Sequence, residues 1–507
     1  MAIGREERAE HVDEPQPPLA TPDGEPASVV HVAAELAPFA RSGGLGEAVA
    51  ALARYQCAAG IPVAVVMPLY GAVRASSRGI APVGEPFTVQ LGDHRVGVRL
   101  YRSTERSADL PQVYFVENAH AFDRAGMYGV GGHDYPDNAY RFALFCRAVV
   151  EALPRIAPTP TVVVHAHDWH GALVPVYLRL TGAQRLPLRR VRSVLTVHNA
   201  GYQGVFPAST MPEIGLPWEL FDWRRLEWHG QLNCLKGGLV FSDMVTTVSP
   251  THAHELRTGA GGFGLHGVFV WLRDRFVGIV NGIDQRQWSP ERDPDIPYRF
   301  TRDDLRNKRR CRWALQHGFG LERRAHVPIF ALTARLVSQK GLDLILGDPG
   351  YFALDAQYIF LGSGEPRYEQ ALSNIAARAP SRIAVEFEFS EPLEHALLAG
   401  ADLCLMPSLY EPCGLTQMRA QRYGTIPVAR RVGGLADTIE DGVTGFLFDD
   451  YTPSAFMDAV VRALDHYRDR EAWRAMMREA MARDFGWERS EQRYRDVYRR
   501  ALARHEA

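Results

Sequence analysis

The chain has 507 residues, of which 46% are hydrophobic and 23% are charged, with a formal net charge of -2. A chain of this length exceeds what one compact core supports, so we expect two domains of ordinary size. The balance of Lys+Arg 57 against Asp+Glu 59 favours neither nucleic acid nor an anionic membrane as a partner.

The six cysteines are widely scattered and form no C-x-x-C pair or metal-ligand spacing. We expect them to be core residues in a reducing cytoplasm. No apolar run approaches membrane-spanning length, and the N-terminus lacks the apolar region of a signal peptide. Residues 1–27 are acidic and proline-rich, and we expect a disordered extension there.

Short apolar runs alternate with helical patterns through the first half of the chain. We expect strands at 29–34, 61–68, 161–164, 193–197 and 244–248, and helices over 45–58, 141–152 and 171–180. Several of these strands lead directly into polar residues. This arrangement is typical of a doubly wound parallel sheet with its site along the carboxyl ends of the strands.

A glycine pair lies between the first strand and the first helix. Gly43 and Gly44 allow backbone N–H groups to face a ligand, and the helix dipole favours an anion there. Arg41 adds a cation at the same place. Two glycines alone are a weak signal, because any tight turn of this kind can use them.

Histidines gather at two further strand ends. The strand from Thr161 runs into His165-Ala166-His167-Asp168-Trp169-His170, and the strand from Ser193 ends in His198 and Asn199. The first cluster fits no standard zinc pattern, since no fourth distant ligand is evident. We therefore favour substrate contacts or hydrogen-bonded structural histidines over a metal site.

A charged, proline-containing linker follows Trp288, so we place the domain boundary near residue 290. The predicted units are 28–290, 291–485 and a terminal helical segment 486–507. The second half begins with a helix over 302–317 and a strand over 327–333. Arg335 and Lys340 flank the next strand-to-helix turn, where a diphosphate would require two cations. A solvated basic turn is the alternative.

The stretch Leu405 to Gln417 has the most distinctive composition of the second half. Pro407 and Pro412 forbid a continuous helix, which places Glu411 in a stiff turn at a strand's carboxyl end. A helix is expected from about Leu415. The carboxylate could bind ligand hydroxyls, although turn chemistry alone also explains the proline and glycine residues.

Other elements of this half follow the same alternation. We expect strands at 357–361, 383–389 and 425–428, with Phe389 near the end of the second. The patterns also predict a helix over 454–485 and a final amphipathic helix over 490–503.

From about Val29 to Tyr498, the chain resembles the bacterial glycogen synthase and plant starch synthase family. The segments that match are Arg41-Ser42-Gly43-Gly44-Leu45, His165 to His170, Thr196 to Asn199, Leu235-Lys236-Gly237-Gly238-Leu239, Val248 to Thr251, Asn281-Gly282-Ile283-Asp284, Arg335 to Leu342, Glu411 to Gln417 and Gly433 to Thr438. The combination in this order is specific, although each piece alone is not.

The resemblance implies the GT-B fold, an α/β architecture of two Rossmann-like doubly wound domains facing across a cleft, with the last helix crossing back to the first. It also implies retaining transfer of glucose from ADP-glucose to the non-reducing end of an α-1,4-glucan, without a metal or other cofactor. UDP-glucose is the alternative donor.

The resemblance implies a set of site residues as well. The catalytic group is Glu411, His198, Arg335, Lys340 and Asp168. The substrate-binding group is Arg41, Gly43, Gly44, Tyr128, Asn199, Asn281, Phe389, Cys413, Gly414, Leu415 and Thr416. Phe389 is a candidate for stacking on the nucleotide base, and Asp168 would lie on the acceptor side.

The chain departs from the family pattern in places. Arg41 and Glu47 replace the family's lysine and aspartate, Gly347 to Gly350 interrupts an expected helix, and Glu440 to Gly445 is shorter than in many members. These departures motivate two alternatives: an inactive glucan-binding or regulatory protein, and a transferase with another acceptor.

Related activities are less compatible with the sequence. Many other retaining GT-B transferases carry a second glutamate eight positions on, where this chain has Arg419. A hydrolase would need two facing carboxylates, and no such pair is evident.

Overall fold

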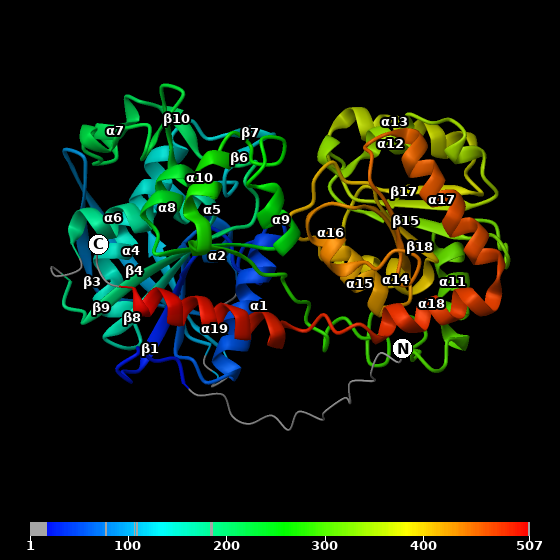
Figure 1. Ribbon diagram of the computed structural model, residues 1–507, viewed down its shortest axis with the longest axis horizontal. Coiled ribbons are helices and arrows are strands. Elements are labelled where there is room, and N and C mark those ends of the chain that lie inside the picture. The colour runs from blue at the N-terminus through cyan, green and yellow to red at the C-terminus, as the bar shows by residue number, and fades with distance from the viewer. Residues whose placement is uncertain (1–17, 77–78, 106, 108–109, 183–185, 505–507) are drawn as a thin grey trace, which may run out of the picture.

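The computed structural model describes residues 18–76, 79–105, 107, 110–182 and 186–504. The chain forms two lobes, each built on one α/β sheet (Figure 1). We call the part around the nine-stranded sheet the first lobe and the part around the six-stranded sheet the second lobe. The GT-B fold class predicted from the sequence is confirmed.

The first sheet has the order β14-β13-β9-β8-β1-β2-β5-β4-β3. Its strands are β1 (Ala27–Val32), β2 (Val63–Pro68), β3 (Ile80–Leu91), β4 (His94–Ser103), β5 (Gln112–Glu117), β8 (Thr161–His167), β9 (Arg190–Val197), β13 (Met244–Thr247) and β14 (Phe276–Gly278). Strands β14 through β5 are parallel, and β4 runs antiparallel to both neighbours. Every residue of β1, β2 and β8 is buried, as expected where helices cover both faces.

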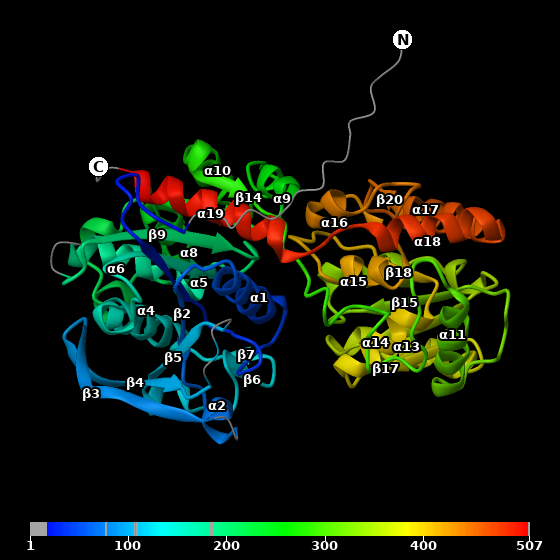
Figure 2. The ribbon, with the colours of Figure 1, turned by 90° about the horizontal axis from the view of Figure 1, so that it is seen from below.

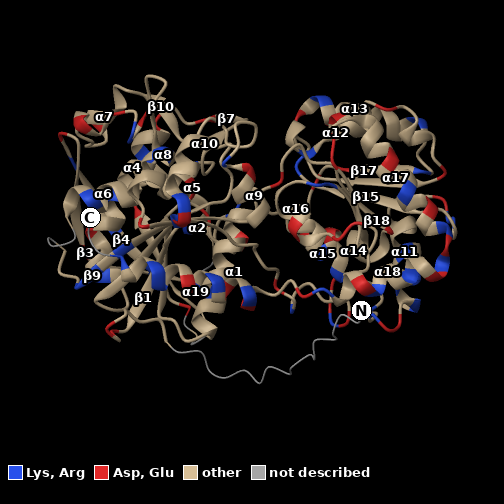
Figure 3. Cartoon of the chain, in the orientation of Figure 1, with Lys and Arg blue, Asp and Glu red and all other residues tan. Residues whose placement is uncertain are grey.

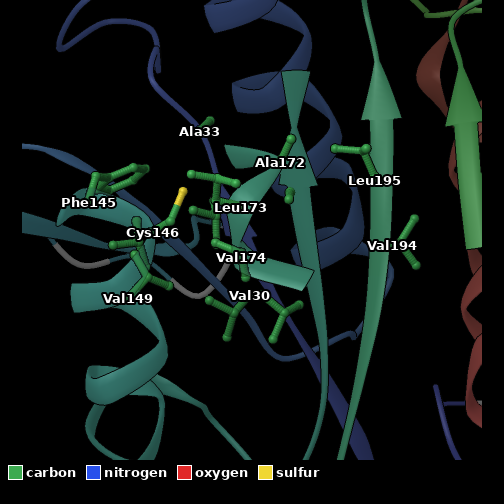
Figure 4. Close-up of a cluster of buried hydrophobic side chains, with 14 of the residues drawn as sticks. Val30, Ala33, Phe145, Cys146, Val149, Ala172, Leu173, Val174, Val194 and Leu195 are labelled. Atoms are coloured by element: carbon green, nitrogen blue, oxygen red, sulfur yellow. The ribbon is translucent and has the colours of Figure 1, made fainter. Parts of the chain in front are cut away.

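The helices of the first lobe pack apolar side chains onto this sheet. The longer ones are α1 (Gly44–Ala58), α4 (Asn138–Ile156), α6 (Leu173–Thr181), α8 (Cys234–Phe241), α9 (Pro250–Glu255) and α10 (His266–Leu272). In Figure 4, Phe145, Cys146 and Val149 of α4 lie beside Leu173 and Val174, which shows part of this core.

Short elements complete the first lobe. They are α2 (Gly71–Ala75), α3 (Ala119–Phe122), α5 (Asp168–Gly171), α7 (Thr210–Glu213), β6 (Gly129–Val130), β7 (His133–Asp134) and a three-stranded sheet of β10 (Val205–Pro207), β12 (Gln231–Asn233) and β11 (Glu227–Trp228).

The second sheet is parallel throughout, with the order β17-β16-β15-β18-β19-β20. Its strands are β15 (Ile329–Thr333), β16 (Gln357–Leu361), β17 (Ile383–Glu386), β18 (Leu403–Met406), β19 (Ile426–Arg430) and β20 (Phe446–Phe448). The helices of this lobe are α11 (Arg306–Gly318), α12 (Leu342–Leu346), α13 (Pro366–Arg378), α14 (Glu391–Gly400), α15 (Thr416–Arg422), α16 (Gly433–Thr438), α17 (Pro453–Arg468) and α18 (Arg470–Ala482).

The last helix, α19 (Trp487–Ala503), leaves the second lobe and lies along the first (Figures 1 and 2). It packs against α1 and against the strands β8, β9 and β13. Trp487, Tyr494 and Tyr498 are buried in this contact. The Arg495 guanidinium donates to the Ala59 carbonyl at 3.1 Å, which fixes the end of α1.

Three details differ from the predictions. The helix expected over 454–485 is two helices, because Asp469 accepts hydrogen bonds from the amides of Glu471 and Ala472 and caps α18. Residues 18–26, expected to be disordered, form a hydrogen-bonded turn in which Leu19 is buried. The rest of that extension, residues 1–17, lies outside the described residues. Finally, β17 ends at Glu386, so Phe389 lies beyond the strand.

Residues of both charges are distributed over both lobes (Figure 3). This distribution agrees with the formal net charge of -2. None of the described helices combines the length and the apolar character needed to cross a membrane.

Candidate active site

The predicted site residues lie at the carboxyl ends of strands in both lobes. Asp168, His198 and Asn199 follow β8 and β9 in the first lobe. Lys340 and Glu411 follow β15 and β18 in the second. The two groups lie where the lobes meet, and α9 of the first lobe packs against α16 of the second (Figure 1).

Asp168 organises the first-lobe group. Its Oδ1 accepts hydrogen bonds from the backbone amides of His198 at 2.7 Å and Asn199 at 3.3 Å. Its backbone has φ 52, a left-handed conformation that is uncommon outside glycine. Burial raises the pKa of Asp168 to about 7, against the opposing effect of the two amides. A strained and desolvated carboxyl group at a strand end is typical of a functional site.

A second buried carboxylate, Glu35, holds the glycine loop. Its two oxygens accept from the Ser42 amide at 2.7 Å and the Ser42 hydroxyl at 2.6 Å. The Tyr128 hydroxyl donates to it at 2.7 Å. The Tyr128 ring also stacks on His170, with centroids 4.7 Å apart. Tyr128 is therefore fixed between the glycine loop and the strand-end histidines.

Glu411 is the centre of the second-lobe group. Its Oε2 accepts from the Lys340 ammonium at 2.6 Å and from the Ser408 hydroxyl at 3.0 Å. The residue is 5% exposed. Within the part of the chain that the structure describes, its other oxygen, Oε1, accepts no hydrogen bond. One carboxylate oxygen thus remains to accept from a ligand.

Glycines from two other loops pack directly on the Glu411 turn. A Cβ on Gly433 would lie 1.9 Å from the Glu411 carbonyl oxygen, and a Cβ on Gly341 would lie 1.9 Å from that of Pro407. Both glycines also have positive φ. No larger residue fits at either position, so these glycines keep the turn close to the Lys340 loop.

The turn after Glu411 presents backbone donors. Gly414 has φ 71, and α15 begins at Thr416. The first N–H groups of a helix lack intrahelical acceptors, so the Leu415 and Thr416 amides are suited to an anion. Arg335 is exposed beside this region and acts electrostatically on Tyr410.

Direct contacts join the two groups across the cleft. The Tyr410 hydroxyl lies beside the Asn199 side chain, since both are near Gly201, and the Tyr410 ring meets Phe263 with centroids 5.0 Å apart. Asp437 accepts from the Thr251 hydroxyl at 2.6 Å, and Glu255 accepts from the Gly433 amide at 2.8 Å. The lobes are therefore held together at the site.

Gly43 and Gly44 lie at the same junction. Gly44 is so close to the second lobe that a Cβ on it would lie 3.9 Å from the Leu415 side chain. The glycine loop of the first lobe therefore faces the backbone donors of the second.

Arg41 makes contacts that the sequence did not indicate. Its two terminal nitrogens donate to Glu47 at 2.6 Å and to Glu391 of the second lobe at 2.8 Å. Glu47 also pairs with Arg419, which in turn bonds Glu394 at 3.2 Å. In this structure the Arg41 guanidinium is therefore engaged in an ion pair between the lobes. Its role as a ligand for phosphate remains a prediction.

A cavity of about 520 Å³ opens between the lobes beside this network. It is lined by Arg41, Leu415 and Phe389, among other residues. Phe389 is 48% exposed. An exposed ring at the wall of a cavity is available for stacking.

Cys413 and Asn281 lie behind the Glu411 turn. Cys413 is 5% exposed and belongs to an apolar cluster with Met418 and Leu435. Burial raises the pKa of its thiol to about 12, so the sulfur carries no charge at neutral pH. The backbone amide of Asn281 opposes this rise in the pKa of Cys413, and Asn281 Oδ1 is buried without a partner among the described residues. Both residues are buried next to Glu411 and pack against the turn that holds it.

Three buried imidazoles, those of His31, His165 and His167, have ring nitrogens within 4.8 Å of one another. A metal could be held at such a spacing, but the nitrogens bond to each other and to Gln56, Tyr498 and Thr196. The lone pairs that a metal would require are used within this network. The observed contacts match the hydrogen-bonded alternative.

Sequence reasoning missed three residues of this region. Glu35 is the one charged residue between Val29 and Phe39 in a stretch that is otherwise apolar except for His31, and this could have marked it. Glu391 and Tyr410 carry no such signal, because their contacts join segments more than 200 residues apart.

Comparison with known proteins agrees with this geometry. The profile of the starch synthase catalytic domain matches residues 28–271, and that of glycosyl transferases group 1 matches residues 319–480. A glycogen synthase from Anaeromyxobacter sp. (strain Fw109-5) is 45% identical over 489 residues, which cover 94% of this chain and 99% of the relative. The chain belongs to the glycogen synthase and starch synthase family. As a family member it is a glycosyltransferase.

Further family members extend the comparison. Glycogen synthase 2 from Geobacter sulfurreducens is 41% identical, with coverage of 93% of this chain and 98% of the relative. The catalytic domain of starch synthase IV from Arabidopsis thaliana, bound to ADP and acarbose, aligns with a TM-score of 0.85 at 33% identity, covering 94% of this chain and 99% of that one. A sucrose-phosphate synthase from Thermosynechococcus elongatus, at 17% identity and a TM-score of 0.59 with coverage of 94% and 99%, shares the fold.

Proposed function

We propose that this synthase-family member is a retaining glucosyltransferase that moves glucose from ADP-glucose to the non-reducing end of an α-1,4-glucan. The observation that carries the proposal is the Lys340–Glu411 pair at 2.6 Å, in contact through Tyr410 with the His198–Asn199 strand end of the other lobe. Cationic, carboxylate and imidazole groups thus meet from both lobes at one junction.

The donor diphosphate binds to the second lobe. Arg335 and Lys340 supply positive charge, and the amides of Leu415 and Thr416 supply backbone donors. Gly43 and Gly44 add amides from the first lobe. These groups stabilise the negative charge that builds up on the leaving nucleoside diphosphate. The base stacks on Phe389.

The glucose lies between Glu411 and His198. The free Oε1 of Glu411 accepts from a sugar hydroxyl, while Lys340 holds the other oxygen in place. The His198 carbonyl lies near the anomeric carbon, where positive charge develops as the bond to the diphosphate breaks. Asn199 contacts the same sugar.

Asp168 serves the acceptor side of the cleft. It orients the His198–Asn199 backbone through its two amide contacts. Because its pKa is about 7, it can accept a proton near neutral pH as an acceptor hydroxyl attacks.

The charge on Arg419 argues against the related two-glutamate transferases. This residue stands eight positions after Glu411, and its guanidinium is paired with Glu47 and Glu394. It therefore fills a structural role between the lobes, which leaves Glu411 without a carboxylate partner in the same turn.

The test is incorporation of labelled glucose into glycogen. Purified protein with ADP-[14C]glucose, glycogen and EDTA is expected to label the polymer and release ADP. A parallel reaction with UDP-[14C]glucose is expected to be slower. Absence of transfer from every nucleoside diphosphate glucose would refute the proposal.

The Arg41 contacts favour one second candidate, a glucan-binding protein without turnover. Engagement of Arg41 by two carboxylates removes a cation from the glycine loop. Calorimetry with ADP-glucose and with a maltooligosaccharide, run beside the transfer assay, separates the two: binding without transfer identifies the second candidate.

A further inference from the structure

A chain of hydrogen bonds crosses the interior of the first lobe and ends at His198. Gln56 Oε1 lies 2.8 Å from His31 Nε2, and His31 Nδ1 lies 3.0 Å from His167 Nε2. His167 Nδ1 lies 3.0 Å from His198 Nε2. We call Gln56, His31 and His167 the histidine relay. All three are buried, with exposures of 1% or less.

The sheet register explains why these side chains meet. His31 on β1 pairs with His165 on β8, and His167 on β8 pairs with Thr196 on β9. Residues that pair across parallel strands, and residues two apart along one strand, point to the same face. The relay therefore runs across neighbouring strands beneath α1, which supplies Gln56.

Each imidazole of the chain carries a single ring proton. Burial lowers the pKa of His31 to about 4 and that of His198 to about 3, and lowers that of His167 well below its ordinary value. A contact between two ring nitrogens needs one N–H and one lone pair. The proton position in one ring therefore dictates the position in the next ring, along the whole relay.

Tyr498 of α19 determines which way the Gln56 amide is turned, and so which ring nitrogens carry the protons. The Gln56 amide nitrogen donates to the Tyr498 hydroxyl at 2.8 Å, which turns the amide oxygen toward His31. With this orientation of the amide, the hydroxyl is left to donate to His165 Nδ1, 2.8 Å away, so the His165 proton lies on Nε2, 2.6 Å from the Thr196 hydroxyl.

The orientation of the Gln56 amide fixes the proton position in each ring as far as His198. Because the Gln56 oxygen accepts, His31 carries its proton on Nε2, and His167 and His198 must do the same. His198 Nδ1 is then an unprotonated acceptor, and it bonds to nothing among the described residues. The reverse orientation of the amide would place an N–H there instead.

We propose that the histidine relay and Tyr498 are positioning residues that hold His198 as the Nε2–H tautomer, so that Nδ1 accepts a hydrogen bond from a sugar hydroxyl in the cleft. The identity of that ligand rests on the proposed function, whereas the tautomer is a property of the fold. A lone pair facing the sugar also suits a centre that gains positive charge during transfer.

The first measurement is the tautomer itself. The full chain, labelled with 15N-histidine, is studied by long-range 1H–15N NMR, and the His198→Asn variant assigns the His198 signals. We expect a protonated nitrogen at Nε2 and an unprotonated one at Nδ1. A proton on Nδ1 would overturn the proposal. Because this readout needs no turnover, a correct tautomer in a protein that transfers no glucose would refute the proposed function alone.

The second measurement uses two tyrosines of one helix. Tyr498→Phe frees the Gln56 amide and should mix the His198 tautomers, lowering kcat by about tenfold with little change in the donor KM. Tyr494→Phe removes another buried hydroxyl of α19, which contacts Thr196 and Thr246 but not Gln56, and should leave the His198 signals unchanged. Identical His198 signals and rates in the two variants would overturn the role of Tyr498.

A third variant tests rescue at Gln56. Gln56→Glu keeps an acceptor facing His31 and should retain the Nε2–H tautomer of His198. Gln56→Met removes the acceptor and should lose it. Loss of the tautomer in both variants, with folding intact by circular dichroism, would contradict the relay.

Discussion

Asp168 combines an uncommon backbone conformation with a buried carboxyl group. Its φ of 52 costs free energy in the folded backbone, and its burial disfavours the ionised form of the carboxyl group. The folded pKa of about 7 exceeds the ordinary value of 3.8, so the folded protein retains a proton that the unfolded chain releases between these values. Stability therefore falls as the pH rises from about 4 to about 7.

Replacing Asp168 by asparagine should relieve this cost. Asparagine tolerates the left-handed conformation and can still accept from both amides. The difference between pKa 3.8 and about 7 corresponds to roughly 4 kcal/mol. We therefore expect Asp168→Asn to raise the free energy of unfolding by up to that amount at pH 8. The gain should shrink at pH 5. Calorimetric unfolding at both values checks this, and a gain independent of pH would contradict it.

The same substitution should change the rate in the opposite direction. If ionised Asp168 is the active form, the wild-type rate rises with pH through about 7, and the asparagine variant lacks that limb. We expect a loss of about tenfold at pH 8. The pH profile of kcat for both proteins is the measurement, and superimposable profiles would remove Asp168 from the chemistry.

Lys340 and Glu411 form a largely buried pair whose structural and chemical roles can be separated. Lys340→Met leaves Glu411 without its charged partner, and we expect a loss of about 1 to 3 kcal/mol in stability and at least a hundredfold in kcat. Lys340→Met/Glu411→Gln removes the unpaired charge and should recover stability without recovering turnover. Recovery of both would mean that the pair is only structural.

The positions of the main candidate site residues could be predicted from the sequence, because apolar runs show where the strands end. Glu411, Lys340, His198 and Asp168 all follow apolar runs, and parallel strands bring their carboxyl ends to one edge. The hydrogen-bond partners of these side chains could not be predicted, because contacts such as that of Arg41 with Glu391 join residues 350 apart in the sequence.

At the scale of elements, an ion pair between the lobes joins the loop before α1 to the start of α14. Arg41 precedes α1, and Glu391 is the first residue of α14. Both side chains are about one third exposed, at 39% and 30%. Pairs of this exposure contribute about 0 to 1 kcal/mol, so this pair biases closure of the cleft but does not lock it.

Glu391→Gln tests that bias. We expect the donor KM to rise by up to about fivefold, with kcat within a factor of two, because the substitution removes a contact that holds the two lobes together. High salt should raise the wild-type KM toward that of the variant. Glu117→Gln removes a similar pair with Arg74 inside the first lobe and is the matched control. Equal effects of the two substitutions would rule out a role in closure.

Element boundaries show what local pattern can and cannot predict. The strand at 357–361 was predicted to the residue, because turn signals bound a short apolar run. The helical pattern over 454–485 did not reveal the break at Asp469, because the residues on both sides of it have the composition of a helix. The periodicity of one helix and of two collinear segments is the same, so only the cap distinguishes them.

At the scale of the whole molecule, the last helix couples the two lobes to the site. Helix α19 leaves the second lobe, covers the first sheet and supplies Tyr498 to the interior of that lobe. Sequence periodicity predicted the helix, whereas its place on the first lobe was implied only by the family resemblance. A helix that is amphipathic does not reveal which apolar surface it will cover.

The arrangement of the lobes is also what makes the site complete. Neither lobe alone holds both Lys340 and His198, and the contact between Tyr410 and Asn199 brings the two groups together. The central claim is therefore that one cleft transfers glucose with retention of configuration.

The linkage of the product tests that claim most directly. Protein is incubated with ADP-glucose and maltoheptaose, and 1H NMR follows the anomeric signals of the extended oligosaccharide. We predict new α-1,4 linkages at the non-reducing end, and none with Glu411→Gln. A β-linked product, or free glucose in place of a longer chain, would contradict it.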